Sequence, residues 1–320
     1  MQQWTCTQPG SFEQQETEIP TRPMGFSLLR TKAVGICGTD IHAYAGNQPF
    51  FQYPRILGHE LALEVVESER FPTGELVTII PYFHCGECGA CRQGKTNCCE
   101  KMQVFGVHVD GGMREYIVVE DRYILAGQGL STEELALVEP LSIAAHGLRR
   151  GKIQAGEKVL VMGAGPIGLF TCLLAKIQGA DVEVSEPNAS RLAFCEEHLG
   201  VGSSTKTHYQ TVIDATGNKA AIESGFAKIA HGGQYILIGL QKEAISFIHP
   251  EFHKREATLM SSRNATTEDF TYVMDLLRSK QIDIKPFITH HFEWQKVSEE
   301  FTSVHDPSRK IVKAVIHVKN

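Results

Sequence analysis

A strand, turn and helix with three spaced glycines constrain the fold of this chain most strongly. The apolar run Lys158–Met162 predicts a buried strand, and a helical run follows from Pro166 to Gln178. Gly163, Gly165 and Gly168 have the spacing G-x-G-x-x-G at the junction. The first glycine permits a tight turn, the second lets the backbone approach a pyrophosphate, and the third lets the helix pack closely on the strand. This context predicts a dinucleotide site rather than a mere connecting turn.

Other residues near this turn complete the predicted nucleotide site. Pro166 and Ile167 open the helix, whose free N–H groups suit a pyrophosphate. Glu186 follows the second predicted strand, Asp181–Ser185. A carboxylate there accepts hydrogen bonds from ribose hydroxyls and repels a 2′-phosphate, so we predict NAD rather than NADP. Two alternatives stay open: Glu186 could be a solvated strand-end residue, and Arg191 could bind a 2′-phosphate.

Strands and helices alternate after residue 146. The further predicted strands are Thr211–Ala215, Tyr235–Gly239 and Thr258–Ser261, and the further predicted helices are Asn188–His198 and Thr267–Lys280. Such alternation predicts an α/β fold with a doubly wound parallel sheet. The rest of the chain has strand-and-loop character, for example at Leu76–Ile80, Tyr116–Val119 and Ile311–Val318. We therefore predict a Rossmann domain at 146–285 and a mostly β domain at 1–145 and 286–320.

The segment between Leu199 and Thr211 is too short for the strand and helix that a full unit would place there. Either the crossover is reduced to a loop, or residues are missing from the chain. The sequence leaves both possibilities open.

Composition excludes several classes of protein. The net charge of −6 argues against general nucleic-acid binding, which needs a basic surface. No run of eighteen apolar residues predicts a membrane span, and the N-terminus lacks the basic and apolar parts of a secretory signal. We expect a cytoplasmic protein with a small-molecule substrate, without nucleic-acid or membrane partners.

Five of the nine cysteines lie between Cys85 and Cys99. Without a signal peptide, this clustering favours a metal site over disulfides. Cys85, Cys88, Cys91 and Cys99 supply four thiolates, the ligand set of a closed structural zinc site. Cys98 could replace Cys99 on spacing alone, and an iron–sulfur cluster is the rival metal centre.

A second candidate metal set is spread along the chain. Cys37, His59, Glu60 and Glu139 could hold zinc through a thiolate, an imidazole and a carboxylate, leaving one position open, as in catalytic zinc sites. Each residue also has an ordinary structural explanation: a core thiol, a buried histidine or a helix-end carboxylate.

The motifs GICGTDIH, ILGHE, the C-x2-C-x2-C-x7-C loop and the glycine turn occur in the order found in the zinc-containing medium-chain dehydrogenases, which the chain resembles over essentially its whole length. The pairing of GHE with VEP is most similar to the sorbitol and threonine dehydrogenase branch. This resemblance implies a GroES-like catalytic domain beside the Rossmann domain, two zinc ions per chain, and a homodimer or homotetramer.

The resemblance also implies roles for individual residues. Cys37, His59 and Glu139 would hold the catalytic zinc with Glu60 in or next to the ligand set, and Cys99 rather than Cys98 would complete the structural site. A hydride would pass from a secondary alcohol to NAD. Thr39 and His42 would relay the released proton, although the first could be a turn residue and the second a surface histidine.

The phrases GGMREY and FHKREATLMSSRNA resemble bacterial sugar-acid and polyol dehydrogenases of the L-gulonate and L-galactonate type. The candidate substrate contacts are Tyr82, Phe83, Phe105, Arg114 and Arg263. A cationic side chain suits the carboxylate of an aldonate; Arg263 could instead support Glu139, and Arg114 could be solvated. The rival functions are an L-threonine 3-dehydrogenase-like enzyme and a non-catalytic NAD(P)-binding protein.

Three features depart from this family pattern: the shortened stretch after Leu199, a trimmed ERFPTGELV segment, and Glu183 inside a normally apolar strand. They raise a question about the stability of the nucleotide-binding domain.

Overall fold

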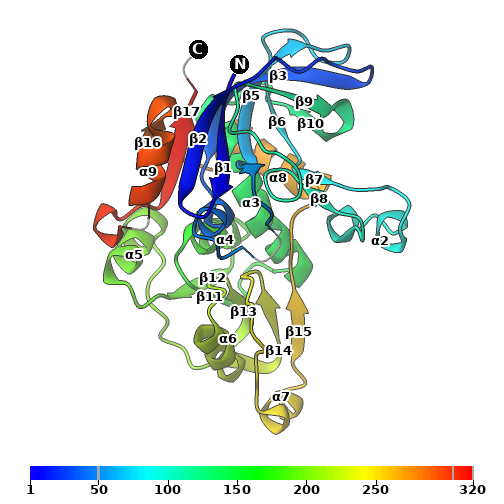
Figure 1. Cartoon of the computed structure of the whole chain (residues 1–320). Coiled ribbons are helices and arrows are strands. Elements are labelled where there is room, and N and C mark those ends of the chain that lie inside the picture. Colours follow the sequence, from blue (N-terminus) through cyan, green and yellow to red (C-terminus); the bar gives the residue numbers. More distant parts are fainter. Residues whose placement is uncertain (49–50, 305, 319–320) are drawn as a thin grey trace. The chain divides into compact units, whose positions relative to one another are not determined.

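The computed structural model describes residues 1–48, 51–304 and 306–318, which form two compact units (Figure 1). The first unit comprises Met1–Glu139 and Thr266–Asn320, and the second comprises Pro140–Ala265. Both predicted classes of structure are present: a mostly β unit and a unit with a parallel sheet. No helix in the described ranges is both long and apolar enough to cross a bilayer.

The boundaries between the units differ from the predicted ones, at 145/146 and 285/286. Helix α8 (Thr267–Arg278), predicted for the nucleotide-binding domain, belongs to the first unit. The reason is its packing: Phe270 meets the Tyr82 ring edge-on with centroids 6.2 Å apart. The Arg278 guanidinium also donates to the Ala126 carbonyl oxygen over 3.1 Å. These tertiary contacts are not visible in the alternation of strands and helices.

Three sheets build the first unit. The largest has the order β10-β6-β5-β3-β17-β16, and β9 pairs with β3 as well. Its strands are β3 (Phe26–Gly35), β5 (Glu60–Glu67), β6 (Leu76–Ile79), β9 (Tyr116–Glu120), β10 (Ile124–Ala126), β16 (Ile288–Glu293) and β17 (Lys313–His317). The smaller sheets contain β1 (Gln2–Gln8), β2 (Ser11–Glu16) and β4 (Arg55–Ile56), and β7 (Tyr82–Phe83) with β8 (Gln103–Val104). The last strand, β17, thus lies beside β3, the third strand of the chain.

Short helices connect these strands. They are α1 (Gly38–Tyr44), α2 (Gly89–Arg92) and α9 (Val297–Ser303), and the long α3 (Thr132–Gly151) runs from the first unit into the second. Ser131 and Glu134 cap α3 reciprocally: the Glu134 carboxylate accepts from the Ser131 N–H over 2.8 Å, and the Ser131 hydroxyl accepts from the Glu134 N–H over 3.2 Å. This capping box fixes the first helical turn.

The second unit is a five-stranded parallel sheet with the order β12-β11-β13-β14-β15. The strands are β11 (Lys158–Met162), β12 (Asp181–Ser185), β13 (Tyr209–Asp214), β14 (Ile229–Leu237) and β15 (Thr258–Ser261). The helices are α4 (Pro166–Ile177), α5 (Ala189–Phe194), α6 (Lys219–Gly225) and α7 (His249–Lys254). The predicted α/β fold with a parallel sheet is confirmed.

The crossover between α5 and β13 is a loop. A π-helical turn, Cys195–Leu199, ends the helix, and only Ser203 then pairs with the sheet, in a single parallel bridge to Val184. The Val184 N–H donates to the Gly202 carbonyl oxygen over 3.0 Å. In the structure, one bridge stands where a full unit would place a strand.

Glu183 fastens this short loop to the sheet. Its carboxylate accepts hydrogen bonds from the Thr205 N–H at 2.8 Å, the Lys206 ammonium at 2.6 Å and the Tyr209 hydroxyl at 2.5 Å. Burial by itself disfavours the carboxylate, but these donors outweigh it and hold the pKa of Glu183 well below its usual range. The acidic residue in the strand is thus the anchor of the loop.

We expect Glu183→Gln to lower the free energy of unfolding by about 1–3 kcal/mol near neutral pH, since charge-assisted hydrogen bonds are lost. A carboxylate with a depressed folded-state pKa stabilises the fold above its unfolded pKa, and this contribution is lost as the pH falls. Urea unfolding of both proteins at about pH 7 and about pH 4 measures this, and the difference should shrink at the lower pH.

The exposed Glu197 offers a matched control, because its side chain keeps 75% of its accessible surface. Glu197→Gln should leave the unfolding midpoint nearly unchanged. A Glu183→Gln effect that is the same at both pH values would contradict the charged-anchor explanation.

Candidate functional site

Four cysteine sulfurs gather in the loop around α2. Cys85, Cys88, Cys91 and Cys99 have their sulfur atoms within 4.8 Å of one another, whereas Cys98 is exposed and outside the group. The Cys85 and Cys99 sulfurs are 3.5 Å apart, and the Cys88 and Cys99 sulfurs are 4.0 Å apart. Tetrahedral zinc with bonds of about 2.3 Å needs sulfur separations of roughly 3.8 Å. The cluster therefore fits a closed zinc site.

Backbone N–H groups help this loop to hold thiolates. The N–H groups of Glu100 and Cys91 lower the pKa of the Cys88 thiol to about 6. The opposite holds at Cys91, where burial raises the pKa to about 12. All four residues become thiolates together only when a cation offsets their charge, as metal binding does.

A second cluster lies where β5 begins. The ligand atoms of Cys37, His59 and Glu60 lie within 4.8 Å of one another. Cys37 is the residue before α1, and His59 and Glu60 stand at the start of β5. Gly35 makes room for the carboxylate, because a Cβ there would lie 2.1 Å from Glu60 Oε2. The Cys37 thiol, the His59 imidazole and the Glu60 carboxylate thus come together, whereas Glu139, the carboxylate ligand that the resemblance implied, is not in this group.

Negative charges surround His59. Burial disfavours the imidazolium, but the Asp40 carboxylate and the Cys37 sulfur outweigh it, so the pKa of His59 is raised well above its ordinary value. Its Nδ1 atom is buried without a hydrogen-bond partner and lies 3.7 Å from Asp40 Oδ1. A buried imidazole nitrogen without a partner, among thiol and carboxylate groups, fits a zinc ion.

Asp40 was not predicted from the sequence. Its carboxylate accepts from the Cys37 N–H over 2.9 Å and from the Gly58 N–H over 3.2 Å, so it joins the two segments that carry the cluster. Its position three residues after the residue preceding α1 is the signal of a capping box.

Lys313 was also missed. Its ammonium is buried on β17, forms an ion pair with the Glu60 carboxylate and donates to the Ile36 carbonyl oxygen over 3.0 Å. Burial disfavours the charged amine, but the Glu60 carboxylate outweighs it and raises the pKa of Lys313. A lone lysine inside the apolar run IVKAVIHV was the available signal.

Glu139 lies outside the three-residue cluster but close to it electrostatically. Its carboxylate accepts a hydrogen bond from the Tyr82 hydroxyl. Burial raises the pKa of Glu139 to about 7, His59 acts against this rise, and Glu60 adds to it. Glu60 is therefore in the cluster, and Glu139 is held beside it by Tyr82.

The glycine turn of the second unit has the features expected of a nucleotide site. Gly163 has a φ of +93°, and a Cβ on Gly168 would lie 1.9 Å from the Gly163 carbonyl oxygen, so helix α4 packs directly on the turn. Gly165 precedes Pro166 at the helix start and has no atom within 4 Å of its would-be Cβ. This open helix N-terminus fits a pyrophosphate.

Glu186 lies at this turn. Its carboxylate accepts from the Ala164 N–H and the Asn188 N–H, both over 2.8 Å. Ile167 lies in the first turn of α4, and Arg191 is exposed on α5. The structure thus brings Glu186 to the glycine turn, as a ribose contact requires.

Two family models match the chain: the alcohol dehydrogenase GroES-like domain at residues 24–128 and the zinc-binding dehydrogenase domain at residues 166–279. The chain is 41% identical to an L-galactonate-5-dehydrogenase of Escherichia coli over 330 residues, 97% of each chain. It belongs to the zinc-binding alcohol dehydrogenases.

Two further similar proteins are consistent with this family membership. An L-threonine 3-dehydrogenase of Pyrococcus horikoshii is 32% identical, and the match covers 92% of each chain. A crystal structure described as a short chain alcohol dehydrogenase from Escherichia coli CFT073, complexed with NADH, has a TM-score of 0.92 at 28% identity and covers 99% of each chain.

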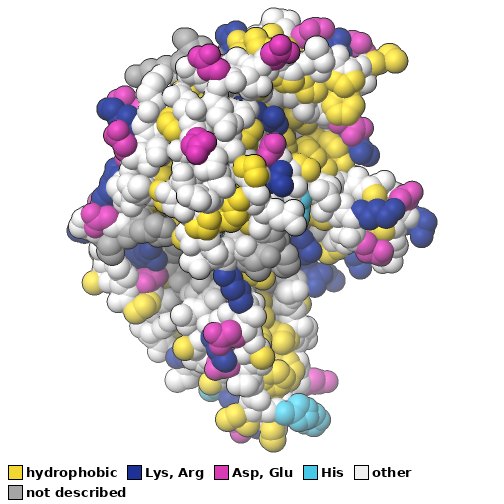
Figure 2. Space-filling view, viewed as in Figure 1, with side chains coloured by type: hydrophobic (Ala, Val, Ile, Leu, Met, Phe, Trp, Pro, Cys, Tyr) yellow, Lys and Arg dark blue, Asp and Glu magenta, His cyan; other side chains and the backbone are white. Residues whose placement is uncertain are grey.

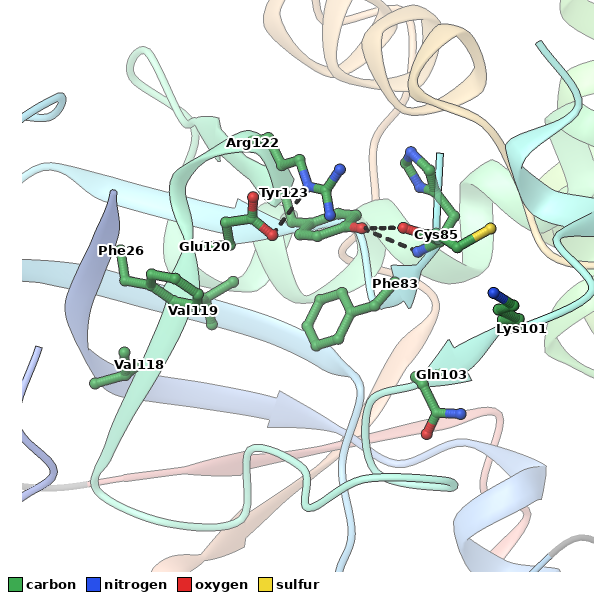
Figure 3. Close-up of a pocket in the computed structure, with 11 residues that line it drawn as sticks. Phe26, Phe83, Cys85, Lys101, Gln103, Val118, Val119, Glu120, Arg122 and Tyr123 are labelled. Atoms are coloured by element: carbon green, nitrogen blue, oxygen red, sulfur yellow. Dashed lines mark hydrogen bonds and ion pairs between the residues drawn. The ribbon is translucent and has the colours of Figure 1, made fainter. Parts of the chain in front are cut away.

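The predicted substrate residues of this dehydrogenase lie in several places. Tyr82 contacts Glu139, whereas Phe83 lines a separate pocket of about 280 Å³ beside Cys85 (Figure 3). In the close-up, Phe83 and Tyr123 lie side by side, with ring centroids 4.6 Å apart. Neighbouring residues of a strand point to opposite faces, which explains why Tyr82 and Phe83 diverge.

Phe105 and the predicted arginines are placed as follows. Phe105 is buried, 5.7 Å from Phe83 between ring centroids, and the Arg114 guanidinium lies over its ring at 5.9 Å. Burial lowers the pKa of Arg114, although Asp110 acts in the opposite sense. Arg263 follows β15 in the second unit and is exposed.

The two residues predicted to relay a proton lie on α1. Thr39 is half-buried, and His42 is exposed.

We expect two zinc ions per chain by elemental analysis. Cys37→Ser should retain one ion and the fold but lose turnover, whereas Cys85→Ala should lose the structural ion and unfold at lower temperature, since structural zinc contributes folding free energy. Cys98→Ser is the matched control and should retain both ions. Iron in place of zinc, or full activity after complete chelation, would contradict this assignment.

Proposed function

We propose that this protein is a zinc-dependent, NAD-linked dehydrogenase that oxidises a secondary alcohol of a sugar acid or polyol. The observation that carries the proposal is the cluster of half-buried Cys37 with buried His59 and Glu60, in a chain 41% identical to an L-galactonate-5-dehydrogenase. The presence of every candidate ligand argues against a non-catalytic NAD(P)-binding protein.

Cys37, His59 and Glu139 would hold the catalytic zinc in this proposal. Lys313 already neutralises Glu60 through their ion pair, which leaves Glu60 as the partner next to the ligand set. The Tyr82 hydroxyl would orient the Glu139 carboxylate, and Asp40 would hold the segments that carry Cys37 and His59 together through its bonds to the Cys37 and Gly58 N–H groups. Such supporting partners fix the orientation of metal ligands.

When bound, zinc supplies a Lewis acid that favours loss of the substrate's hydroxyl proton, and the nicotinamide supplies the hydride acceptor. The remaining task of the chain is to remove that proton. Thr39 and His42 are three residues apart on α1, a spacing that places two side chains on the same helix face. The half-buried Thr39 hydroxyl would accept this proton while releasing its own toward the exposed His42 imidazole, which would hand a proton to solvent.

A second candidate is an L-threonine 3-dehydrogenase activity, favoured by the relative with that name at 32% identity. A panel of aldonates, polyols and L-threonine with NAD distinguishes the two. Turnover of simple apolar alcohols alone would contradict both.

We also infer that the protein is a homo-oligomer. The edge strand β15 and its surroundings carry exposed apolar side chains, visible as a hydrophobic area along β15 and α7 in Figure 2. Leu240, Ile248 and Leu259 keep 65%, 70% and 38% of their accessible surface. Exposed apolar patches of this kind mark interaction sites.

A cytoplasmic location stays a prediction. It is supported by the need of the cysteine cluster for reduced thiols.

Glu186→Ser should narrow the preference for NAD over NADP, because the carboxylate that would bind the ribose and repel a 2′-phosphate is removed. The ratio of kcat/KM for the two cofactors measures the effect. If the native enzyme uses NADP better, Arg191 is the relevant group instead, and Arg191→Ala should then reduce NADP use.

Arg114→Ala and Arg263→Ala test the contact with a substrate carboxylate. A carboxylate clamp should lose activity mainly on an aldonate and little on the matching neutral polyol, by about 1.5–3 kcal/mol in kcat/KM for one charged hydrogen bond. Equal losses on both substrates would show that the arginine does not read the carboxylate.

A further inference from the structure

Three ligand-type side chains meet on the surface of the first unit, away in sequence from both cysteine clusters. They are Glu133 on α3, His291 on β16 and His317 on β17, and their ligand atoms lie within 4.8 Å of one another. We propose that these residues form a third metal site, which binds a divalent transition-metal ion that favours imidazole nitrogen.

The sheet register places the two histidines together. Strands β16 and β17 pair in parallel, with His291 opposite Val315 and Glu293 opposite His317. His317 is two residues beyond Val315, and side chains two apart share one face of a sheet. Both imidazoles therefore project from the same face.

The capped start of α3 supplies the carboxylate. The Ser131–Glu134 capping box fixes the first turn, in which Glu133 lies. Glu133 Oε1 is 3.6 Å from His291 Nδ1 and 3.8 Å from His317 Nε2. The carboxylate thus faces both imidazoles at once.

The separations suit a shared ion. His291 Nδ1 and His317 Nε2 are 2.9 Å apart, in hydrogen-bond contact. With metal–ligand bonds of about 2.0–2.1 Å, ligand atoms lie roughly 2.9 Å apart at a right angle and roughly 3.4 Å apart in a tetrahedron. The three observed separations need changes of a few tenths of an ångström to meet these values.

The ligand chemistry and access favour particular ions. Two imidazoles and one carboxylate suit zinc, nickel or copper and leave positions open for water. The side chains of Glu133, His291 and His317 keep 38%, 52% and 33% of their accessible surface, so an ion reaches them directly from solvent. An ion there would cross-link α3 to β16 and β17.

Nickel binding to the zinc-loaded protein tests this site, since Ni²⁺ favours imidazole over the soft thiolates that retain zinc. Isothermal titration with Ni²⁺ should show one additional ion per chain, and the melting temperature should rise with Ni²⁺ concentration. Bound Cu²⁺ should show two nitrogen couplings in its electron paramagnetic resonance spectrum. His291→Ala and His317→Ala should each abolish the additional Ni²⁺ and remove one nitrogen coupling.

His290→Ala is the matched control. His290 neighbours His291 on the same strand but points to the opposite face, where its ring lies edge-on to Phe292 with ring centroids 6.4 Å apart. It should retain the additional Ni²⁺. Absence of Ni²⁺ binding, or binding that survives both His291→Ala and His317→Ala, would show that the two imidazoles form only a hydrogen bond. Neither outcome depends on which substrate the enzyme oxidises.

Discussion

The buried ion pair between Lys313 and Glu60 is the interaction on which the first unit depends. Cys37, Asp40, Glu60 and Glu139 gather acidic groups in a part of the unit with little access to water. Burying such charges costs several kcal/mol for each ion unless cations offset them. Lys313 provides one cation from the last strand, and a zinc ion would provide the rest. The last strand, β17, therefore pairs with β3 in the sheet whose strand β5 carries Glu60, and the second unit lies in the chain between the two parts of the first.

The second unit shows how a parallel sheet tolerates a reduced crossover. Only Ser203 bridges to the outer strand, so the loop lacks the ladder of hydrogen bonds that a full strand would give it. Glu183 replaces that ladder with a charged anchor for Lys206 and Tyr209. Glu183 pairs with Leu160 in the middle of strand β11, and the glycine turn that follows the strand keeps its tight geometry.

Helix α3 and strand β17 each carry one residue of the proposed surface metal site and one residue in or beside the buried cluster around His59. Helix α3 carries Glu133 in its first turn and Glu139 six residues later, about 9 Å along the axis. Strand β17 carries Lys313 at its start and His317 at its end. A metal ion bound by Glu133, His291 and His317 would therefore fix the positions of α3 and β17, the same elements that hold Glu139 and Lys313.

The sequence by itself determined the local features. The glycine turn, its strand and helix, and the cysteine loop all follow from residues a few positions apart, because turn geometry and metal-ligand spacing are set by short stretches of chain. Tertiary structure decided the rest. Lys313 meets Glu60 across 253 positions, Tyr82 holds Glu139 beside the cluster, and α8 joins the first unit. These contacts depend on sheet order, register and packing, and spacing along the sequence does not encode which distant side chains those arrangements bring together.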